Sequence, residues 1–241
     1  MKTLFATIIS SFLIIGITLV GNAQTTSKDK KEKLQNYVES FYNQGTFNGV
    51  VLVAQKGQVI ISEGYGYANM EFKVENTLAT KFMLGSITKI FTATTVMKLI
   101  DQGKLSLDTK LTDILPWYRN DTGSKVNVRH LLNHTSGIPN YLDMRGKSIY
   151  DVANEFGTAP INKVEFIKKY SQGDLEFEPG TKWNYNNSAY FLLGLIIEEV
   201  TGKPYEKVLQ ELIFDPLQMA NTGDMQPNPQ KIVPNLAEGY T

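Results

Sequence analysis

The chain has 241 residues, of which 42% are hydrophobic and 11% aromatic, and this is enough to build one sizeable domain. Lys and Arg total 24, and Asp and Glu also total 24, so the charge does not favour nucleic acid or an anionic membrane as a partner. Cysteine is absent, which excludes disulfides, a cysteine nucleophile and thiolate metal sites.

The N-terminus carries an export pattern. Lys2 precedes a nearly continuous apolar run, Leu4–Val20, and small residues follow up to Ala23. We predict a signal peptide over residues 1–23, with a mature domain over residues 24–241. An uncleaved anchor is the alternative, but the run is slightly short for a membrane span, and no other stretch of the sequence could cross a membrane. Export without disulfides favours a bacterial periplasm or cell envelope, or release from the cell.

The first part of the mature chain predicts one helix and one hairpin. Apolar residues at helical spacing indicate an amphipathic helix over residues 30–44. Two β-rich runs follow, Val50–Ala54 and Val59–Ser62, and the dipeptide Lys56–Gly57 between them suits a hairpin turn. We expect an irregular stretch up to Phe82, so that the hairpin is the only sheet that the sequence indicates.

The rest of the chain is predicted to be helical with many turns. A long apolar helix opens at Ser86 and stops before Gly103, and a turn is expected at Glu178–Gly180. Further helices are expected over residues 126–133, 161–170, 188–201 and 205–213, followed by a loop-like tail.

Ser86 and Lys89 open the long helix three residues apart, which places them on one helix face. A serine hydroxyl becomes a useful nucleophile when a neighbouring group takes its proton, and a lysine one turn away is such a group. A helix start also offers free backbone N–H groups where an oxyanion develops. The alternative is a helix N-cap beside a solvated lysine. The same spacing recurs at Ser27–Lys30 in a charge-rich stretch, where we interpret it as accidental.

A second polar group precedes the apolar helix that starts near residue 188. Tyr185 and Asn187 can offer a phenol and an amide to one cavity, for proton relay and for hydrogen bonding of a lysine or a substrate carbonyl. The alternative is a turn with a half-buried tyrosine. His130 and His134 have helical spacing, but no glutamate in the H-E-x-x-H manner and no third ligand accompany them, so we predict no metal site and no cofactor.

Together, Gly85–Lys89 and Tyr185–Asn187 resemble the first two motifs of the penicillin-recognising serine hydrolases. The similarity is to the subgroup of class C β-lactamases, DD-peptidases and esterases. It extends to Gly103–Asp108, His130–Gly137 and Leu192–Glu198, which stand in the family's order.

The resemblance implies an α+β fold of the β-lactamase/transpeptidase type, an antiparallel sheet flanked by helices plus a helical lobe. It implies that Ser86 is the acylated nucleophile, that Lys89 and Tyr185 share proton transfer, and that Asn187 orients Lys89 and the substrate amide. The backbone N–H of Ser86 would supply half of the oxyanion hole. His134 would belong to a structural turn of the family.

The sequence departs from the family at its C-terminal end. The family's third motif, K-T-G or H-x-G on a late strand, is not found, and we expect the family's last strands and C-terminal helix to be missing. The leading hypothesis is an exported serine hydrolase that cleaves a β-lactam, a D-Ala-D-Ala peptide or a small ester. The alternatives are a non-catalytic protein that binds cell-wall peptides or regulates a relative, and an inactive truncated remnant. The oligomeric state stays open.

Overall fold

A computed structural model describes residues 28–142, 162–223 and 232–240 of the chain. The chain divides into two compact units, one made of Met1–Met83 with Val233–Thr241 and the other of Leu84–Ile232. The predicted signal peptide lies outside the described residues. Within these residues, none of the helices is both long and apolar enough to span a membrane.

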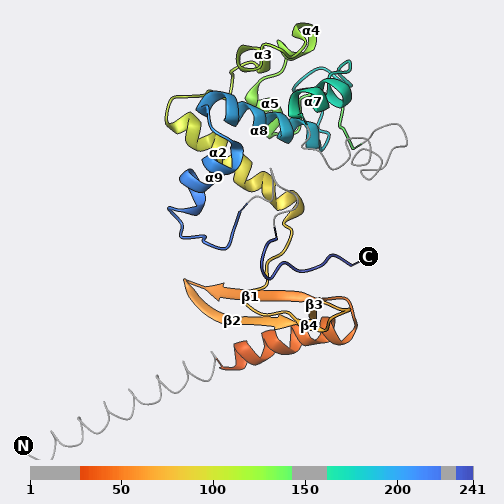
Figure 1. The fold of residues 1–241 in the computed structure, drawn as a ribbon, viewed down its shortest axis with the longest axis vertical. Coiled ribbons are helices and arrows are strands. Elements are labelled where there is room, and N and C mark those ends of the chain that lie inside the picture. The colour runs from red at the N-terminus through yellow and green to blue at the C-terminus, as the bar shows by residue number, and fades with distance from the viewer. Residues whose placement is uncertain (1–27, 143–161, 224–231, 241) are drawn as a thin grey trace, which may run out of the picture. The chain divides into compact units, whose positions relative to one another are not determined.

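The first unit is built on a helix over residues 28–43 and an antiparallel hairpin, β1 (Gly49–Gln55) and β2 (Gln58–Tyr65) (Figure 1). Lys56 and Gly57 form its turn with φ values of 51° and 76°, the left-handed conformation that tight hairpins need. The helix lies along the hairpin in Figure 1, and Gln35 donates to the Glu63 carboxylate at 2.7 Å. The predicted helix and hairpin are therefore confirmed.

The expectation of a single sheet was wrong. Two short strands, β3 (Tyr67–Asn69) and β4 (Val74–Glu75), pair antiparallel in the stretch that we expected to be irregular. Strands of three and two residues are too short to display an alternating pattern. The tail also has a partner, because Ala237 donates its N–H to the carbonyl of Lys81 at 2.9 Å.

The described part of the second unit is helical. A 3₁₀ turn, η1 (Gly85–Ile87), precedes α2 (Thr88–Asp101), so Ser86 lies in a tighter turn than the α-helix that we predicted. The other elements are two short helices missed by the sequence patterns, three predicted helices, and a predicted last helix that continues as a π-helical turn: α3 (Leu111–Ile114), α4 (Asn120–Gly123), α5 (Val128–Leu132), α7 (Lys163–Ser171), α8 (Asn187–Thr201), α9 (Tyr205–Leu209) and η2 (Gln210–Phe214).

Helix α8 lies at the centre of this unit and packs against α2, α5, α7 and α9 (Figure 1). It is hydrophobic around most of its circumference, which suits a helix surrounded by others. The core also takes Val96 and Leu99 from α2. The fully enclosed apolar side chains of α8 are Ala189, Leu192, Leu193, Ile196 and Ile197.

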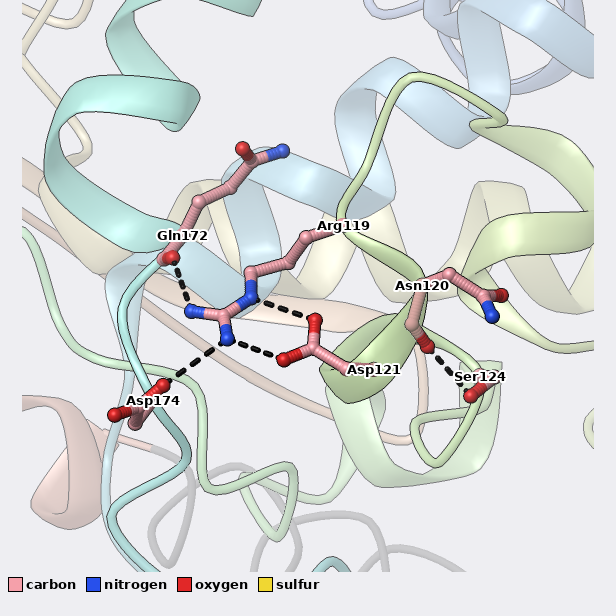
Figure 2. A network of polar contacts seen from close by, with 6 residues as sticks. All are labelled: Arg119, Asn120, Asp121, Ser124, Gln172 and Asp174. Atoms are coloured by element: carbon pink, nitrogen blue, oxygen red, sulfur yellow. Dashed lines mark hydrogen bonds and ion pairs between the residues drawn. The ribbon is translucent and has the colours of Figure 1, made fainter.

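The loop between α7 and α8 is fastened at its start by Arg119. Figure 2 shows the guanidinium ion-paired with Asp121 and with Asp174, the latter at 3.1 Å, while it also donates to the Gln172 carbonyl at 3.1 Å. Because the two carboxylates are exposed, these pairs contribute modest stability. They nevertheless tie the start of the loop to the segment before α4.

The rest of that loop runs beside residues 134–137, which follow α5. Three backbone hydrogen bonds join the two segments: Glu176 N–H to Gly137 O at 2.8 Å, Gly180 N–H to Thr135 O at 2.8 Å, and Asn184 N–H to His134 O at 2.9 Å. These hydrogen bonds fix the position of the backbone up to residue 185, because a shift of either segment would leave backbone N–H and C=O groups without partners.

Gly137 is required at this junction on two counts. Its φ of +70° suits glycine, and a Cβ there would lie 2.2 Å from the carbonyl oxygen of Phe177. Gly103 has the same φ of +70°, but a Cβ there would have nothing within 4 Å.

We therefore expect Gly137→Ala to destabilise the protein more than Gly103→Ala. The left-handed backbone should cost both variants about 1–2 kcal/mol of unfolding free energy, and the clash should add roughly 1–3 kcal/mol to Gly137→Ala alone. Urea unfolding of the two variants measures the difference, and equal losses would contradict the close approach at Gly137.

Candidate active site

Ser86 and Lys89 lie one turn apart at the junction of η1 and α2. The Lys89 ammonium donates to Ser86 Oγ at 3.2 Å, so the predicted neighbourhood of hydroxyl and lysine is present. Ser86 is exposed and Lys89 is half-buried, which leaves the hydroxyl open to a reactant while its neighbour is held.

The N-terminus of α8 supplies the second half of the site. Asn186 is the N-cap of α8, and its side chain accepts from the N–H of Ala189 at 2.8 Å. This cap fixes the two flanking residues relative to the helix. Tyr185 OH lies 2.7 Å from Ser86 Oγ, and Asn187 Oδ1 accepts from Lys89 Nζ at 2.7 Å.

The structure thus brings together all four predicted site residues, although about a hundred positions separate the two pairs in the chain. The Lys89 ammonium also lies 4.9 Å from the centre of the Tyr185 ring. A serine hydroxyl in contact with side chains that can take or stabilise its proton is an arrangement that nucleophilic catalysis uses. The catalytic roles of the four residues stay a prediction.

Tyr185 differs from the other tyrosines around it in its acidity. Hydrogen bonds with Lys89 and with Ser86 lower the pKa of Tyr185 from its ordinary value of 10.0. Burial raises the pKa of Tyr141 and of Tyr190 instead. Groups with specifically perturbed acidity mark candidate acids and bases, which singles out Tyr185.

Two residues that the sequence did not assign to the site support its second half. Asn140 is 8% exposed, and its Oδ1 accepts from the backbone N–H of Asn187 at 3.1 Å. His134 Nδ1 accepts from the backbone N–H of Asn186 at 3.1 Å. In the sequence, His134 and Asn140 belong to a polar turn around Ser136. No pattern in that turn indicates a contact with residues near 186.

The histidine pair has no metal partners in the parts of the chain that the structure describes, where no cluster of three suitable side chains occurs. His130 belongs to the N-terminus of α5, where its Nδ1 accepts from the N–H of Asn127 at 3.4 Å. His130 therefore hydrogen-bonds to the start of α5, whereas His134 hydrogen-bonds to the residue before α8.

Replacing Lys89 by methionine tests the coupling between the lysine and the phenol. We expect Tyr185 to ionise below pH 10 in the unaltered protein, because hydrogen bonds stabilise its phenolate, and to ionise at higher pH in Lys89→Met. Carbon NMR of Cζ-labelled tyrosine, assigned with Tyr185→Phe, measures this titration.

Lys98→Met is the matched control, because Lys98 is an exposed lysine on the same helix. It should leave the titration of Tyr185 unchanged. An identical titration in Lys89→Met and in the unaltered protein would show that the lysine does not stabilise the phenolate.

The chain is similar to proteins that are named for penicillin binding or for hydrolysis. A family model described as Beta-lactamase matches residues 32–238. PbpX of Bacillus subtilis (strain 168), named as a candidate penicillin-binding protein, is 30% identical over 200 residues, which are 83% of this chain and 46% of PbpX.

Two solved structures show the same likeness. FmtA from Staphylococcus aureus superposes with a TM-score of 0.71 at 30% identity, over 89% of this chain and 56% of FmtA. The D-amino acid amidase from Ochrobactrum anthropi SV3 superposes with a TM-score of 0.58 at 29% identity, over 70% of this chain and 45% of the amidase. The chain thus spans about half the length of these relatives.

Proposed function

Because the chain belongs to the beta-lactamase family, whose model matches residues 32–238, we propose that it is a serine hydrolase with Ser86 as its nucleophile. The match also confirms the family resemblance and the α+β fold that the sequence predicted. The observation that carries the proposal is the contact of Ser86 Oγ with both Tyr185 OH, at 2.7 Å, and Lys89 Nζ, at 3.2 Å.

In the acylation step, Ser86 Oγ attacks the carbonyl carbon of an amide or ester and forms a bond to it. Its proton passes to the phenolate oxygen of Tyr185. The carbon–nitrogen or carbon–oxygen bond then breaks, and Tyr185 returns the proton to the leaving group. Lys89 stabilises the phenolate by its hydrogen bond and its charge, and the contact of Lys89 with Asn187 holds the lysine in place.

In the deacylation step, water attacks the ester formed on Ser86. The same phenolate takes the proton of the water and gives it back to Ser86 Oγ as the acid is released. A half-exposed Tyr185, with 37% of its surface accessible, leaves room for substrate and water beside the hydroxyl.

The substrate class that we propose is a small molecule or peptide with a reactive carbonyl, namely a β-lactam, a D-Ala-D-Ala peptide or a small ester. The relatives support this range, because PbpX is named for penicillin binding and the O. anthropi enzyme is named for D-amino acid amides. The chain covers about half of each relative, so the activity of the whole protein belongs to the proposal.

A fluorophosphonate probe tests the nucleophile, because it forms a stable covalent bond with an activated serine. We expect mass spectrometry to place the adduct on Ser86, and Ser86→Ala to lower the labelling rate more than about 10³-fold, since the attacking atom is gone. Ser27→Ala is the control, because Ser27 has the same spacing to a lysine, Lys30. Its labelling should match the unaltered protein.

No adduct on Ser86 under conditions where the protein is folded would overturn the hydrolase proposal. Penicillin binding without an adduct would then favour the alternative of a non-catalytic protein that binds cell-wall peptides.

We propose export as the second part of the function, because the N-terminal pattern ends in a small-residue cleavage site at Ala23. Expression in a Gram-negative bacterium should deliver a mature protein whose N-terminal sequence starts at Gln24. Ala23→Phe should block cleavage, since the peptidase accepts small residues there, and should leave a species about 23 residues longer. If the unaltered protein stays in the cytoplasm at full length, that result would contradict export.

A further inference from the structure

His134 holds the segment that carries Tyr185 from both sides. Its backbone carbonyl accepts from the N–H of Asn184 at 2.9 Å, and its side-chain Nδ1 accepts from the N–H of Asn186 at 3.1 Å. The two donors are the residues immediately before and after Tyr185. One residue of the turn after α5 therefore fixes the backbone on either side of the proposed acid–base group.

The imidazole ring also packs against the site. Its centre lies 4.7 Å from that of the Tyr185 ring and 5.0 Å from that of the Tyr190 ring. His134 has a φ of 58°, a left-handed conformation that is uncommon outside glycine and that histidine, like asparagine and aspartate, adopts more often than other residues. The backbone conformation turns both the carbonyl and the ring toward the same neighbouring loop.

We propose that His134 is a positioning residue that keeps Tyr185 against Ser86 while its imidazole is neutral and releases Tyr185 when Nδ1 is protonated. This inference rests on the proposed function of Ser86 and Tyr185. It assigns no proton transfer to His134, because the ring is bonded to a backbone amide and not to Ser86.

The chemistry of the ring gives the direction of the effect. Since Nδ1 accepts a hydrogen bond, Nε2 carries the proton of the neutral ring. Protonation would place two donors, Nδ1–H and the Asn186 N–H, opposite each other. The hydrogen bond would be lost and the turn around Tyr185 would loosen.

The titratable groups that face the ring are the Lys89 ammonium from α2 and the phenols of Tyr185 and Tyr190. Of these groups, the charge of Lys89 favours the neutral imidazole. Burial, followed by the charge of Lys89, lowers the pKa of His134 from its ordinary 6.5. Because the pKa of folded His134 is lowered, the hydrogen bond to Asn186 is fully present at pH values above the ordinary pKa of histidine. It is lost as the pH falls through the lowered pKa of His134.

Asparagine at position 134 separates this role from simple packing. Asn Oδ1 lies where Nδ1 lies in histidine, accepts a hydrogen bond without titrating, and tolerates a φ of 58°. Alanine has no acceptor. His130→Asn is the matched control, because His130 Nδ1 also accepts from a backbone N–H, that of Asn127, but outside the site.

The experiment measures the rate of fluorophosphonate labelling of Ser86 in the full chain between about pH 5 and pH 8. We expect the acidic fall in rate to move to lower pH in His134→Asn. We expect His134→Ala to label about 3- to 10-fold more slowly across the range, as loss of one hydrogen bond implies. His130→Asn should keep the profile of the unaltered protein. Identical normalised profiles for His134→Asn and the unaltered protein would overturn the inference.

A second measurement does not depend on activity. In Ser86→Ala, nitrogen NMR should show His134 Nδ1 and the Asn186 amide titrating together. If the unaltered protein is unlabelled at every pH, the proposed function fails. The NMR titration then tests by itself whether protonation of His134 breaks its hydrogen bond with Asn186. An Asn186 amide that is insensitive to the protonation of His134 would overturn the inference even in an active enzyme.

Discussion

The apolar packing of α8 against α2 is the constraint on which the candidate site depends. Lys89 lies at the start of one helix and Asn187 at the start of the other, and their 2.7 Å contact exists because the two helices share a core. Buried side chains of α8 such as Leu192 and Ile196 leave this helix little freedom to shift. The hydrophobic core thus sets the distance between the polar side chains that start the two helices.

Core packing places the helices, but it does not place Tyr185, which precedes α8. That task falls to the loop after α7, which is held by Arg119 at its start and by backbone bonds to residues 134–137 along its length. The need for Gly137 follows from the same arrangement, because two backbone segments approach closely there. The site is therefore built from two rigid helix starts and one tethered loop.

Much of this arrangement could be predicted from the sequence, for reasons that differ between its parts. The helical spacing of Ser86 and Lys89 is local, so periodicity alone placed them on one face. Tyr185 and Asn187 could be joined to them through the family resemblance, because no local pattern links residues about a hundred positions apart. The bonds of His134 and Asn140 to the start of α8 escaped prediction, since they depend on how two loops meet.

The errors have equally physical causes. Strands β3 and β4 and helices α3 and α4 are shorter than the windows in which hydrophobic periodicity becomes visible. Gly85, with a φ of +52°, precedes Ser86 and shapes a 3₁₀ turn where the pattern predicted α-helix. Sequence patterns thus identified long elements and missed the short ones that link them.

The charge and the distances of Lys89 and Tyr185 decide how these two neighbours of Ser86 divide their work. As an ammonium, Lys89 contacts Ser86 Oγ at 3.2 Å and Asn187 Oδ1 at 2.7 Å, and in this form it has no lone pair to receive the proton of Ser86. Tyr185 OH lies closer to Ser86 Oγ, at 2.7 Å, and its pKa is lowered by the same lysine. The geometry therefore favours the phenolate as the base and the ammonium as the charge that makes a phenolate accessible.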